Sequence, residues 1–543
     1  MSHPRWSVPL LLLLLAVGIG LCVSTYNVFG HSWDEPEHIA AGMVLIQRGD
    51  YRYDDQHPPL ARLASAIGPH LAGARLPQRL ANSGVTAGRD ILYDAKVGYS
   101  RMLTYARLGM LPFLLVLVIA TWNWTRRWHG EPAAALAALF AVCTPVIIGH
   151  AAVVAVDVAV TGMTMLSLYA LVRWLEFPDL RRTLCLGVAT ALAIASKISA
   201  IPFIGVAALA LIAMRLAMPR ATSPQWHWGR RVPQVLLMLA LIAVITVGLY
   251  GTSMVHPVQS VNQLFPVGTT HHEEAFRIAM NIRVPLGVEK VIANIMGVIW
   301  HNDHGHPSYM LGETSSFGWW YFYPVALAVK TPLPLLILGL SGLMLLAIRG
   351  WRERSLYVMA PTVCFVAILL FCCLYSHINI GVRHVLIAYP LLAIGAAVAV
   401  VAGWQYTRLA WLRTVVAGLA LWQVATMFVV WPDYLAYFNF TAGAHPERIL
   451  VDSDLDWGQD LRRLERELKR RKIDSISIAY MGSADLKREP LPHYTVLKSG
   501  EKTTGWVAID MLSLKEDKKG YAWLLDYQPV QRVGQSIDLY YIR

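Results

Sequence analysis

Acidic side chains gather in one stretch of the sequence, Gly30 to Leu60, directly after the first long apolar run. Pro36 suits the first turn of a helix, and apolar residues then recur at helical spacing, which predicts a short helix at a membrane surface. A carboxylate held at the start of such a helix can accept a proton from a hydroxyl group. We therefore predict that Asp34 is a general base. The stretch holds two acidic clusters, Asp34, Glu35 and Glu37 and then Asp50, Asp54, Asp55 and His57, of which the second is typical of a hydrated turn.

Charged residues also interrupt the apolar runs, where they are costly and mark a functional site by default. Asp157, Lys197 and Lys330 each lie inside such a run, and Arg383 and His384 close a short loop between two runs. The guanidinium fork of arginine and the point charge of lysine both suit a phosphate, and a lipid phosphate is the natural anion at this depth. Two alternatives stay open: Asp157 and Lys197 pair with each other for packing, or Lys330 extends its amine to the membrane surface.

The histidines near residue 301 are the best candidates for metal ligands. His301, His304 and His306 could bind a transition metal, although a solvated loop is the commoner meaning of such a cluster, because no second pair of ligands follows at metal spacing. The run from Asp452 to Gly458 lacks the glycine position and the final glutamate of a calcium loop, and a turn with a helix cap is its commoner meaning. No cofactor is certain, and the need for a divalent metal ion stays open.

A membrane domain must position these residues. The chain has 543 residues, of which 56% are hydrophobic and 15% are charged, and long apolar runs recur along it. Runs of about 18 or more apolar residues are typical of an α-helical polytopic membrane protein. We predict about 11 transmembrane helices, at roughly 8–26, 102–123, 133–149, 151–172, 183–196, 199–217, 233–252, 322–348, 356–375, 385–404 and 412–431.

The positive charge is confined to the membrane part. From Asp433 onward, 17 Lys and Arg residues balance 17 Asp and Glu residues, so the whole excess of +12 belongs to residues 1–432. The segments expected inside carry mostly arginine, as the positive-inside rule requires. This orientation predicts a multi-pass protein of the cytoplasmic (inner) membrane, with its N-terminus inside and its C-terminal domain outside. A basic balance of this kind reflects membrane topology and not nucleic-acid binding.

Three outer segments are long enough to carry structure of their own: about 27–101, 253–321 and 433–543. We divide the chain into a transmembrane domain, 1–432, and a small extracytoplasmic α/β domain, 433–543. All six cysteines lie in apolar runs, so no disulfide framework is expected. In the C-terminal domain we predict strands at 448–452, 475–480 and near 504–511, 521–527 and 536–542, with a charged helix at 459–472.

Five features follow one another along the chain in an order that is similar to a known family. They are the Asp34-Glu35 pair after the first span, the H-P-P-L element within Gln56 to Leu60, Asp157 at the start of the fourth span, the Ser196-Lys197 pair, and the G-W-W-Y-F-Y-P stretch before K-T-P-L-P. Over most of residues 1–432 the sequence resembles the membrane glycosyltransferases of the C superfamily, which have the GT-C fold. It is most similar to the lipid-carrier-dependent type, which includes dolichyl-phosphate-mannose protein mannosyltransferases and the bacterial lipid A aminoarabinose transferase.

The resemblance implies a glycosyltransferase of the cell envelope that moves a hexose or pentose from a polyprenyl-phosphate carrier to a protein, lipid or glycan acceptor. The reaction would take place outside the cytoplasm, with inversion at the anomeric carbon. The resemblance assigns the base to Asp34, acceptor binding to Glu35, and a second acidic position, which shapes the sugar or acceptor site, to Asp157. It assigns the carrier phosphate and sugar to Lys197 and Arg383, with Lys330 and His384 as further candidates and with His57 as either a phosphate contact or a metal ligand.

Two other functions fit parts of the pattern. A transporter or lipid flippase also carries intramembrane Asp and Lys residues. Such proteins usually show inverted repeats and broken helices in matching halves, and the sequence shows no such symmetry. A non-catalytic envelope assembly protein would instead use its C-terminal domain to bind a partner, and loss of Asp34 would then be harmless.

Overall fold

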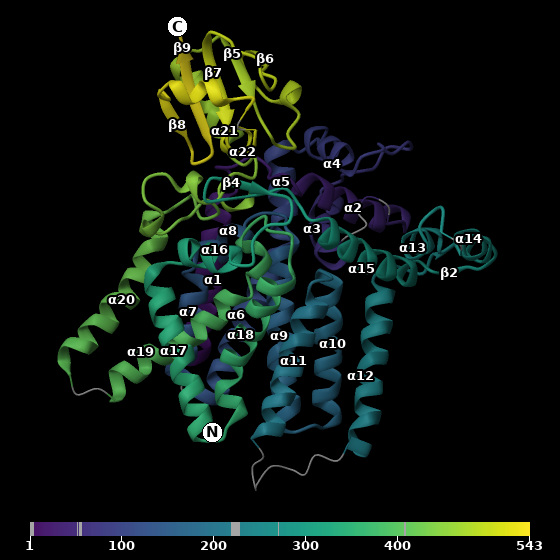
Figure 1. Ribbon diagram of the computed structural model, residues 1–543, viewed down its shortest axis with the longest axis vertical. Helices are drawn as coiled ribbons and strands as arrows, with labels where there is room; N and C mark the ends of the chain where they lie inside the picture. Colours follow the sequence, from purple (N-terminus) through teal and green to yellow (C-terminus); the bar gives the residue numbers. More distant parts are fainter. Residues whose placement is uncertain are drawn as a thin grey trace.

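The computed structural model describes residues 5–51, 53, 57–218, 228–269, 271–406, 409–517 and 519–543. Asp54, Asp55 and Gln56, which belong to the patterns noted above, lie outside the described residues. Figure 1 shows a bundle of long helices, a layer of short elements across one end of the bundle, and a small sheet domain beyond that layer. We call this end outer. The N-terminus lies at the opposite end of the bundle.

Nine helices of the described chain are long and apolar enough to cross a membrane. They are α1 (Ser7–Thr25), the continuous pair α5 (Tyr99–Leu108) and α6 (Leu111–His129), α9 (Val156–Glu176), α11 (Ala200–Ala217), α12 (Trp228–Gly248), α17 (Leu333–Arg352), α18 (Leu356–Tyr375), α19 (Ala388–Tyr406) and α20 (Ala410–Val429). The pair α7 (Glu131–Val142) and α8 (Pro145–Ala151), bent by 61°, adds a broken span. α10 (Leu180–Ser196) has 17 residues and packs against α9 and α12. The prediction of a polytopic helical membrane protein is confirmed.

Two breaks between helices place Lys330 and Lys197 at the outer end of the bundle. α16 (Phe322–Lys330) and α17 stand where one span over 322–348 was predicted, because Pro332 lacks a backbone N–H and disfavours helical geometry in the residue before it. Lys197 lies in extended conformation between α10 and α11, with φ −161° and ψ 138°. The stretch 183–217 is therefore two helices that meet near Lys197.

A layer of short elements, the outer layer, covers the outer ends of the spans (Figure 1). The predicted short helix is α2, but Ile39, Met43 and Val44 in it are fully buried, because α3 and α4 both pack against it. α2 is therefore a core helix of the outer layer and not a helix exposed at the membrane surface. The layer consists of α2 (Glu35–Arg48), α3 (Leu60–Leu71), α4 (Gly84–Tyr93), α13 (Val258–Leu264), α14 (His272–Asn281), α15 (Leu286–His304), the pair β1 (Met254–Val255) and β2 (Val284–Pro285), and the pair β3 (Ser308–Met310) and β4 (Glu313–Ser315).

The C-terminal part folds as the predicted small α/β domain, the sheet domain. Its sheet has the strand order β6-β5-β7-β9-β8, in which β5 lies parallel to β6 and β7 while β9 lies antiparallel to β7 and β8. Leu461, Leu464 and Leu468 on one face of α21 are buried with residues of the sheet. The elements are α21 (Leu461–Arg471), β5 (Ser475–Ala479), β6 (His493–Val496), β7 (Gly505–Asp510), α22 (Met511–Glu516), β8 (Gln531–Val533) and β9 (Ile537–Ile542).

Two of the predicted strands are wrong, since 448–452 is a connection between two 3-10 helices, 446–448 and 452–454, and a third 3-10 helix occupies 522–526. Short apolar runs do not distinguish a strand from a buried turn. Leu450 packs into the core of the membrane bundle and Val451 into the core of the sheet domain, so this segment joins two cores instead of extending a sheet. The 3-10 helices are η1 (Val382–Val385), η2 (Phe440–Ala442), η3 (Pro446–Arg448), η4 (Asp452–Asp454), η5 (Leu486–Arg488) and η6 (Ala522–Asp526).

Candidate active site

A cavity of about 1060 Å³ lies where the spans, the outer layer and the sheet domain meet. Its wall is apolar along α11, α15 and α18, and it is rich in charged side chains near the start of α2 and the sheet domain. Of the candidate site residues predicted from the sequence, those in this wall are Asp34, His57, Lys197, His301, His306, Arg383 and His384. The predicted residues outside this wall are Glu35, Asp157, His304 and Lys330.

Four charged side chains from distant parts of the sequence form one ionic array beside the cavity. A guanidinium nitrogen of Arg383 lies 2.9 Å from a carboxylate oxygen of Asp34 and 3.7 Å from one of Asp157. The amine of Lys197 lies 2.8 Å from the other carboxylate oxygen of Asp157. The side chain of Asp157 is 1% exposed and that of Asp34 is 28% exposed, so Asp34 is the carboxylate that opens to the cavity.

The ends of elements position all four members of the array. Asp34 immediately precedes α2, and Asp157 lies in the first turn of α9. Lys197 occupies the break between α10 and α11, and Arg383 lies in η1 between α18 and α19. Asp34 stands at the N-cap position of α2, but its side chain makes no capping hydrogen bond and binds Arg383 instead.

The positive charge of the cavity wall comes from Lys197 and Arg383. Burial works against the charge on Arg383, but the two carboxylates of the array hold its pKa above the usual value. Burial first and then the nearby charge of Lys197 lower the pKa of His57 to about 4, and the same two causes lower the pKa of His384. Both imidazoles are therefore neutral near pH 7 and offer hydrogen bonds without charge.

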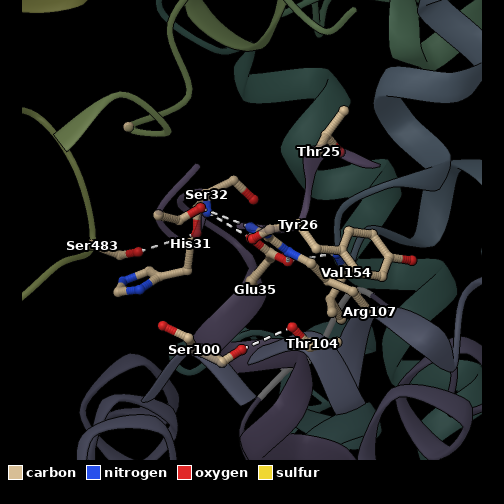
Figure 2. A network of polar contacts seen from close by, with 12 residues as sticks. Thr25, Tyr26, His31, Ser32, Glu35, Ser100, Thr104, Arg107, Val154 and Ser483 are labelled. Carbon is tan, nitrogen blue, oxygen red and sulfur yellow. Dashed lines mark hydrogen bonds and ion pairs between the residues drawn. The ribbon is translucent and has the colours of Figure 1, made fainter. Parts of the chain in front are cut away.

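Glu35 lies outside the cavity in a closed polar network (Figure 2). Its carboxylate accepts two hydrogen bonds of 2.8 Å from Arg107, one of 2.7 Å from the backbone of Ser32 and one of 2.8 Å from the backbone of Val154. Burial opposes the charge of Glu35, but Arg107 and these donors keep its pKa below the usual value. The predicted acceptor contact is therefore not what the structure shows. Glu35 fixes the loop that carries Asp34.

Lys330 also points away from the cavity. Its amine donates to the backbone carbonyl of Leu435 at 2.9 Å and to that of Asp454, and it lies 4.4 Å from the centre of the Phe438 ring. The Lys330 residue is 1% exposed, so the amine neither reaches the membrane surface nor meets a phosphate in the cavity. Lys330 instead holds the segment that leads into the sheet domain.

Comparison with known proteins identifies the fold. Residues 102–250, which include Asp157 and Lys197, match a family model described as dolichyl-phosphate-mannose-protein mannosyltransferase. The oligosaccharyltransferase AglB from Archaeoglobus fulgidus, in complex with an inhibitory peptide and a dolichol-phosphate, is similar with a TM-score of 0.50 and 12% identity, over 99% of this chain and 74% of that one. This chain has the GT-C fold of these membrane glycosyltransferases.

Two further solved structures are similar to this chain. ArnT from Cupriavidus metallidurans, bound to undecaprenyl phosphate, is similar with a TM-score of 0.48 and 14% identity over 97% of each chain. The apo form of the Archaeoglobus fulgidus oligosaccharyltransferase is similar with a TM-score of 0.49 and 13% identity over 80% of this chain, which spans 56% of that longer protein. No curated protein matches the sequence significantly.

The three histidines near residue 301 do not form a metal centre in the described part of the chain. The described residues include no group of three or more His, Cys, Asp or Glu side chains that could hold a metal ion. The rings of His301 and His306 lie 5.3 Å apart in the cavity wall, but His304 bonds to the carbonyl of Trp300 and stacks on its ring. We therefore derive no step through a metal ion.

The sheet domain supplies a wall of the cavity that the sequence did not predict. Asp452, Asp456, Trp457 and Glu516 line the cavity from this side, and Trp33 lies next to Asp34. Burial and the nearby Asp452 raise the pKa of Glu516 to about 7. Asp452, Asp454, Asp456 and Trp457 lie within six residues of sequence, a cluster that indicates a functional loop. Only the tertiary structure shows that this loop faces Asp34.

Proposed function

We propose that this chain transfers a sugar from a polyprenyl-phosphate carrier to an acceptor hydroxyl, with Asp34 as general base. The observation that carries the proposal is the ionic array, in which a cavity-facing carboxylate and two cations meet beside an apolar wall. A phosphate-linked donor needs cations for its leaving group and apolar surface for its lipid chain, and the acceptor needs a base. The cavity offers all three.

The apolar wall suits the lipid chain of the carrier. Ile201 and Phe203 come from α11, Val298 from α15 and Phe371 from α18. Most of α11 is not covered by protein, so this wall lies beside the surface that lipid would contact. A carrier whose chain lies here would bring its phosphate to Lys197 and Arg383. The Archaeoglobus fulgidus enzyme of the same fold was solved with a dolichol-phosphate, which supports a carrier of this class.

The proposed reaction is a single displacement. The acceptor oxygen forms a bond to the anomeric carbon while the bond between that carbon and the phosphate oxygen breaks, and its electron pair leaves with the phosphate. The acceptor proton passes to the carboxylate of Asp34, and attack from the face opposite the phosphate inverts the anomeric centre. A phosphate leaving group needs little protonation, so Arg383 and Lys197 can stabilise it by charge alone. The two carboxylic acids that glycoside hydrolases use are not required.

Donor binding would also release the base. Arg383 lies 2.9 Å from Asp34, and a carrier phosphate would compete for the same guanidinium. Asp157 stays paired with Lys197 at 2.8 Å and is almost fully buried, so it supports the cation and does not itself meet the acceptor. Asp34 therefore becomes available as a proton acceptor when the carrier phosphate arrives.

The distribution of arginines supports a reaction on the extracytoplasmic side. The cavity lies at the outer end of the bundle, and the N-terminus lies at the opposite end (Figure 1). Arg126, Arg127, Arg349 and Arg352 lie in the last turns of α6 and α17. By the positive-inside rule, the arginine-rich ends would face the cytoplasm and the cavity would face the extracytoplasmic side of the inner membrane. A hexose or a pentose fits the proposal equally, and so does a protein, lipid or glycan acceptor.

The first test compares purified wild type with Asp34→Asn in nanodiscs, using radiolabelled undecaprenyl-phosphate-linked hexoses and pentoses. We expect transfer or slow sugar release by wild type and a loss of about 100-fold or more in the variant, the usual contribution of a general base. Undecaprenyl phosphate should bind the variant at least as tightly, because a neutral amide at this position no longer competes for Arg383. Asp303→Asn, which changes an exposed carboxylate outside the cavity wall, is the matched control and should keep wild-type activity.

Two results would contradict the proposal. Equal turnover by wild type and Asp34→Asn would remove Asp34 from the chemistry. Carrier binding without turnover by wild type, across several sugars and acceptors, would favour a transporter or flippase, or a non-catalytic envelope assembly protein, over an enzyme.

A further inference from the structure

One loop of the sheet domain reaches between the two segments that carry Asp34 and Arg383. We call residues 452–459 the bridging loop. On one side, the backbone N–H of Trp33 donates to the carbonyl of Trp457 at 2.9 Å, and that of Gly30 donates to the carbonyl of Gln459 at 3.0 Å. These bonds tie the residue directly before Asp34 to the sheet domain.

The other side of the bridging loop holds the segment of Arg383. The hydroxyl of Ser453 donates to the carbonyl of Ile380 at 2.5 Å, and the backbone N–H of Val382 donates to the carboxylate of Asp454 at 3.1 Å. Gly381 lies against the same loop, where a Cβ would come within 2.3 Å of the Ser453 hydroxyl oxygen. The loop therefore fixes the backbone on both sides of the Asp34–Arg383 ion pair.

Trp457 also contacts the guanidinium itself. The central carbon of the Arg383 guanidinium lies 4.4 Å from the centre of the Trp457 ring, and Trp457 is 5% exposed. The Nε of Arg383 is buried without a hydrogen-bond partner among the described residues. The ion pairs at one edge of the guanidinium and the indole at its face thus set the orientation of the guanidinium plane. The cation–π contact with the indole is stronger because it is shielded from water.

The bridging loop is itself held firmly. The carboxylate of Asp456 accepts from the backbone N–H groups of Gly458 at 3.2 Å and Leu512 at 3.1 Å. The side chain of Gln459 accepts from the backbone of Trp457 at 2.7 Å. Lys330 donates to a carbonyl of the same loop, which explains why this buried cation faces away from the cavity.

We propose that Trp457 is a positioning residue of the active site. It sets the plane of Arg383 and, through its carbonyl, the backbone next to Asp34, so the sheet domain and the membrane domain act as one catalytic unit. The inference rests on the proposed function for its effect on turnover. Its effect on backbone order can be measured without any turnover.

The test compares Trp457→Leu and Trp457→Phe with wild type in nanodiscs. Trp506→Leu is the matched control, because Trp506 lies in the same sheet domain, also beneath an arginine, Arg471 at 5.9 Å, but outside the cavity wall. Turnover of an undecaprenyl-phosphate-linked sugar gives the catalytic effect. Hydrogen exchange of peptides that cover residues 30–34 and 380–384 gives the positioning effect directly, and thermal unfolding reports whether each variant is folded.

We expect Trp457→Leu to lower turnover about tenfold or more, because small displacements of a positioned group are costly. Trp457→Phe, which keeps an aromatic face, should recover most of the loss, and the amides of Trp33 and Val382 should exchange faster in the leucine variant than in wild type or Trp506→Leu. If Trp457→Leu and Trp506→Leu are alike in turnover and in exchange, the proposal is wrong.

The two proposals fail in different ways. Absence of turnover in wild type with every donor would contradict the glycosyltransferase reaction, while faster exchange at 30–34 and 380–384 would still support the positioning role. If Trp457→Leu does not fold, Trp457→Met, which also lacks an aromatic face, decides: faster exchange at these two segments supports the role, and wild-type exchange overturns it.

Discussion

Arg383 is the residue on which the charge balance of the site depends. Its guanidinium faces two carboxylates, and with Lys197 the ionic array has two positive and two negative charges. The neutral His57 and His384 leave this balance unchanged. An anionic phosphate would therefore add net negative charge, and transfer of the acceptor proton to Asp34 removes one negative charge. Binding of the donor and protonation of the base are thus electrostatically complementary.

At the same scale, Lys197 can be tested for function against packing. Lys197→Met removes the nearer cation of Asp157 and leaves only Arg383, 3.7 Å away, which should cost up to about 3–5 kcal/mol of stability, seen as a lower thermal midpoint. Adding Asp157→Asn removes the uncompensated charge, so the double variant should regain most of this stability. Binding of undecaprenyl phosphate should stay weak in both variants, because the phosphate has lost a cation.

The double variant also discriminates between the two interpretations of the pair. If it restores binding of undecaprenyl phosphate along with stability, Lys197 serves packing alone, the alternative that the sequence left open.

Among the elements, α2 matters most, because its start places Asp34. Gly88 of α4 lies so close to it that a Cβ would come within 1.8 Å of the Pro36 carbonyl oxygen. Gly88→Ala should therefore push the first turn of α2, with a stability cost of about 1–3 kcal/mol or more and a loss of turnover larger than the loss of folded protein. Circular dichroism melts and turnover per folded molecule measure the two effects.

Gly418 in α20 provides the matched control for this substitution. It is also a helical glycine, but a Cβ there would meet nothing within 4 Å. Gly418→Ala should leave turnover unchanged and should not lower the melting temperature, because alanine is the better helix former. Equal effects of the two substitutions would show that the close approach at Pro36 does not control the site.

The sequence predicted the elements better than their surroundings. Apolar length was sufficient for most of the spans, but not for 322–348, which Pro332 divides into two helices, and the leucines of α21 were sufficient for an amphipathic helix. The burial of α2 was not predictable, because it depends on α3 and α4, which pack through close glycine contacts. Arg107 within the predicted span 102–123 was a signal that the sequence did carry, since a buried arginine needs a partner, and that partner is Glu35.

At the scale of the whole molecule, pH should control how the sheet domain docks on the outer layer. Burial and the adjacent Glu489 raise the pKa of Glu465 in α21 to about 8. Glu489 also accepts a hydrogen bond from Tyr93 of the outer layer. A carboxyl whose folded-state pKa exceeds its unfolded value of about 4.5 gives stability that is fully present below that value and is lost as the pH rises towards 8.

Thermal unfolding should therefore begin earlier at pH 9 than at pH 5, by a few degrees, and Glu465→Gln should flatten this dependence. Glu467→Gln on the same helix is the control. Hydrogen bonds from Arg470 lower the pKa of Glu467, so this substitution should leave the dependence between pH 5 and pH 9 unchanged. An unchanged slope in Glu465→Gln would assign the pH dependence to other groups.

The residues of the site could be predicted only in part, because they lie far apart along the sequence. Asp34, Asp157, Lys197 and Arg383 were found individually, because charge in apolar surroundings is conspicuous even in a sequence. The pair of Asp157 and Lys197 was one of the alternatives that the sequence left open, but the contacts of Arg383 with Asp34 and Asp157 were not predictable, nor was the wall that includes Trp457. A loop in a polar domain carries no periodicity that relates it to a membrane helix, so only tertiary structure reveals that contact.

The distance between Asp34 and Arg383, 349 residues apart, has a consequence for biosynthesis. At roughly 5–20 residues per second, a ribosome needs about 20–70 s to pass from one to the other. The bridging loop comes later still, so the segment of Asp34 waits in the membrane without its partners through most of translation. On the proposed function, a nascent chain would meet lipid-linked sugar before its base and its arginine are in place, and the sheet domain, made after the spans, would complete the site.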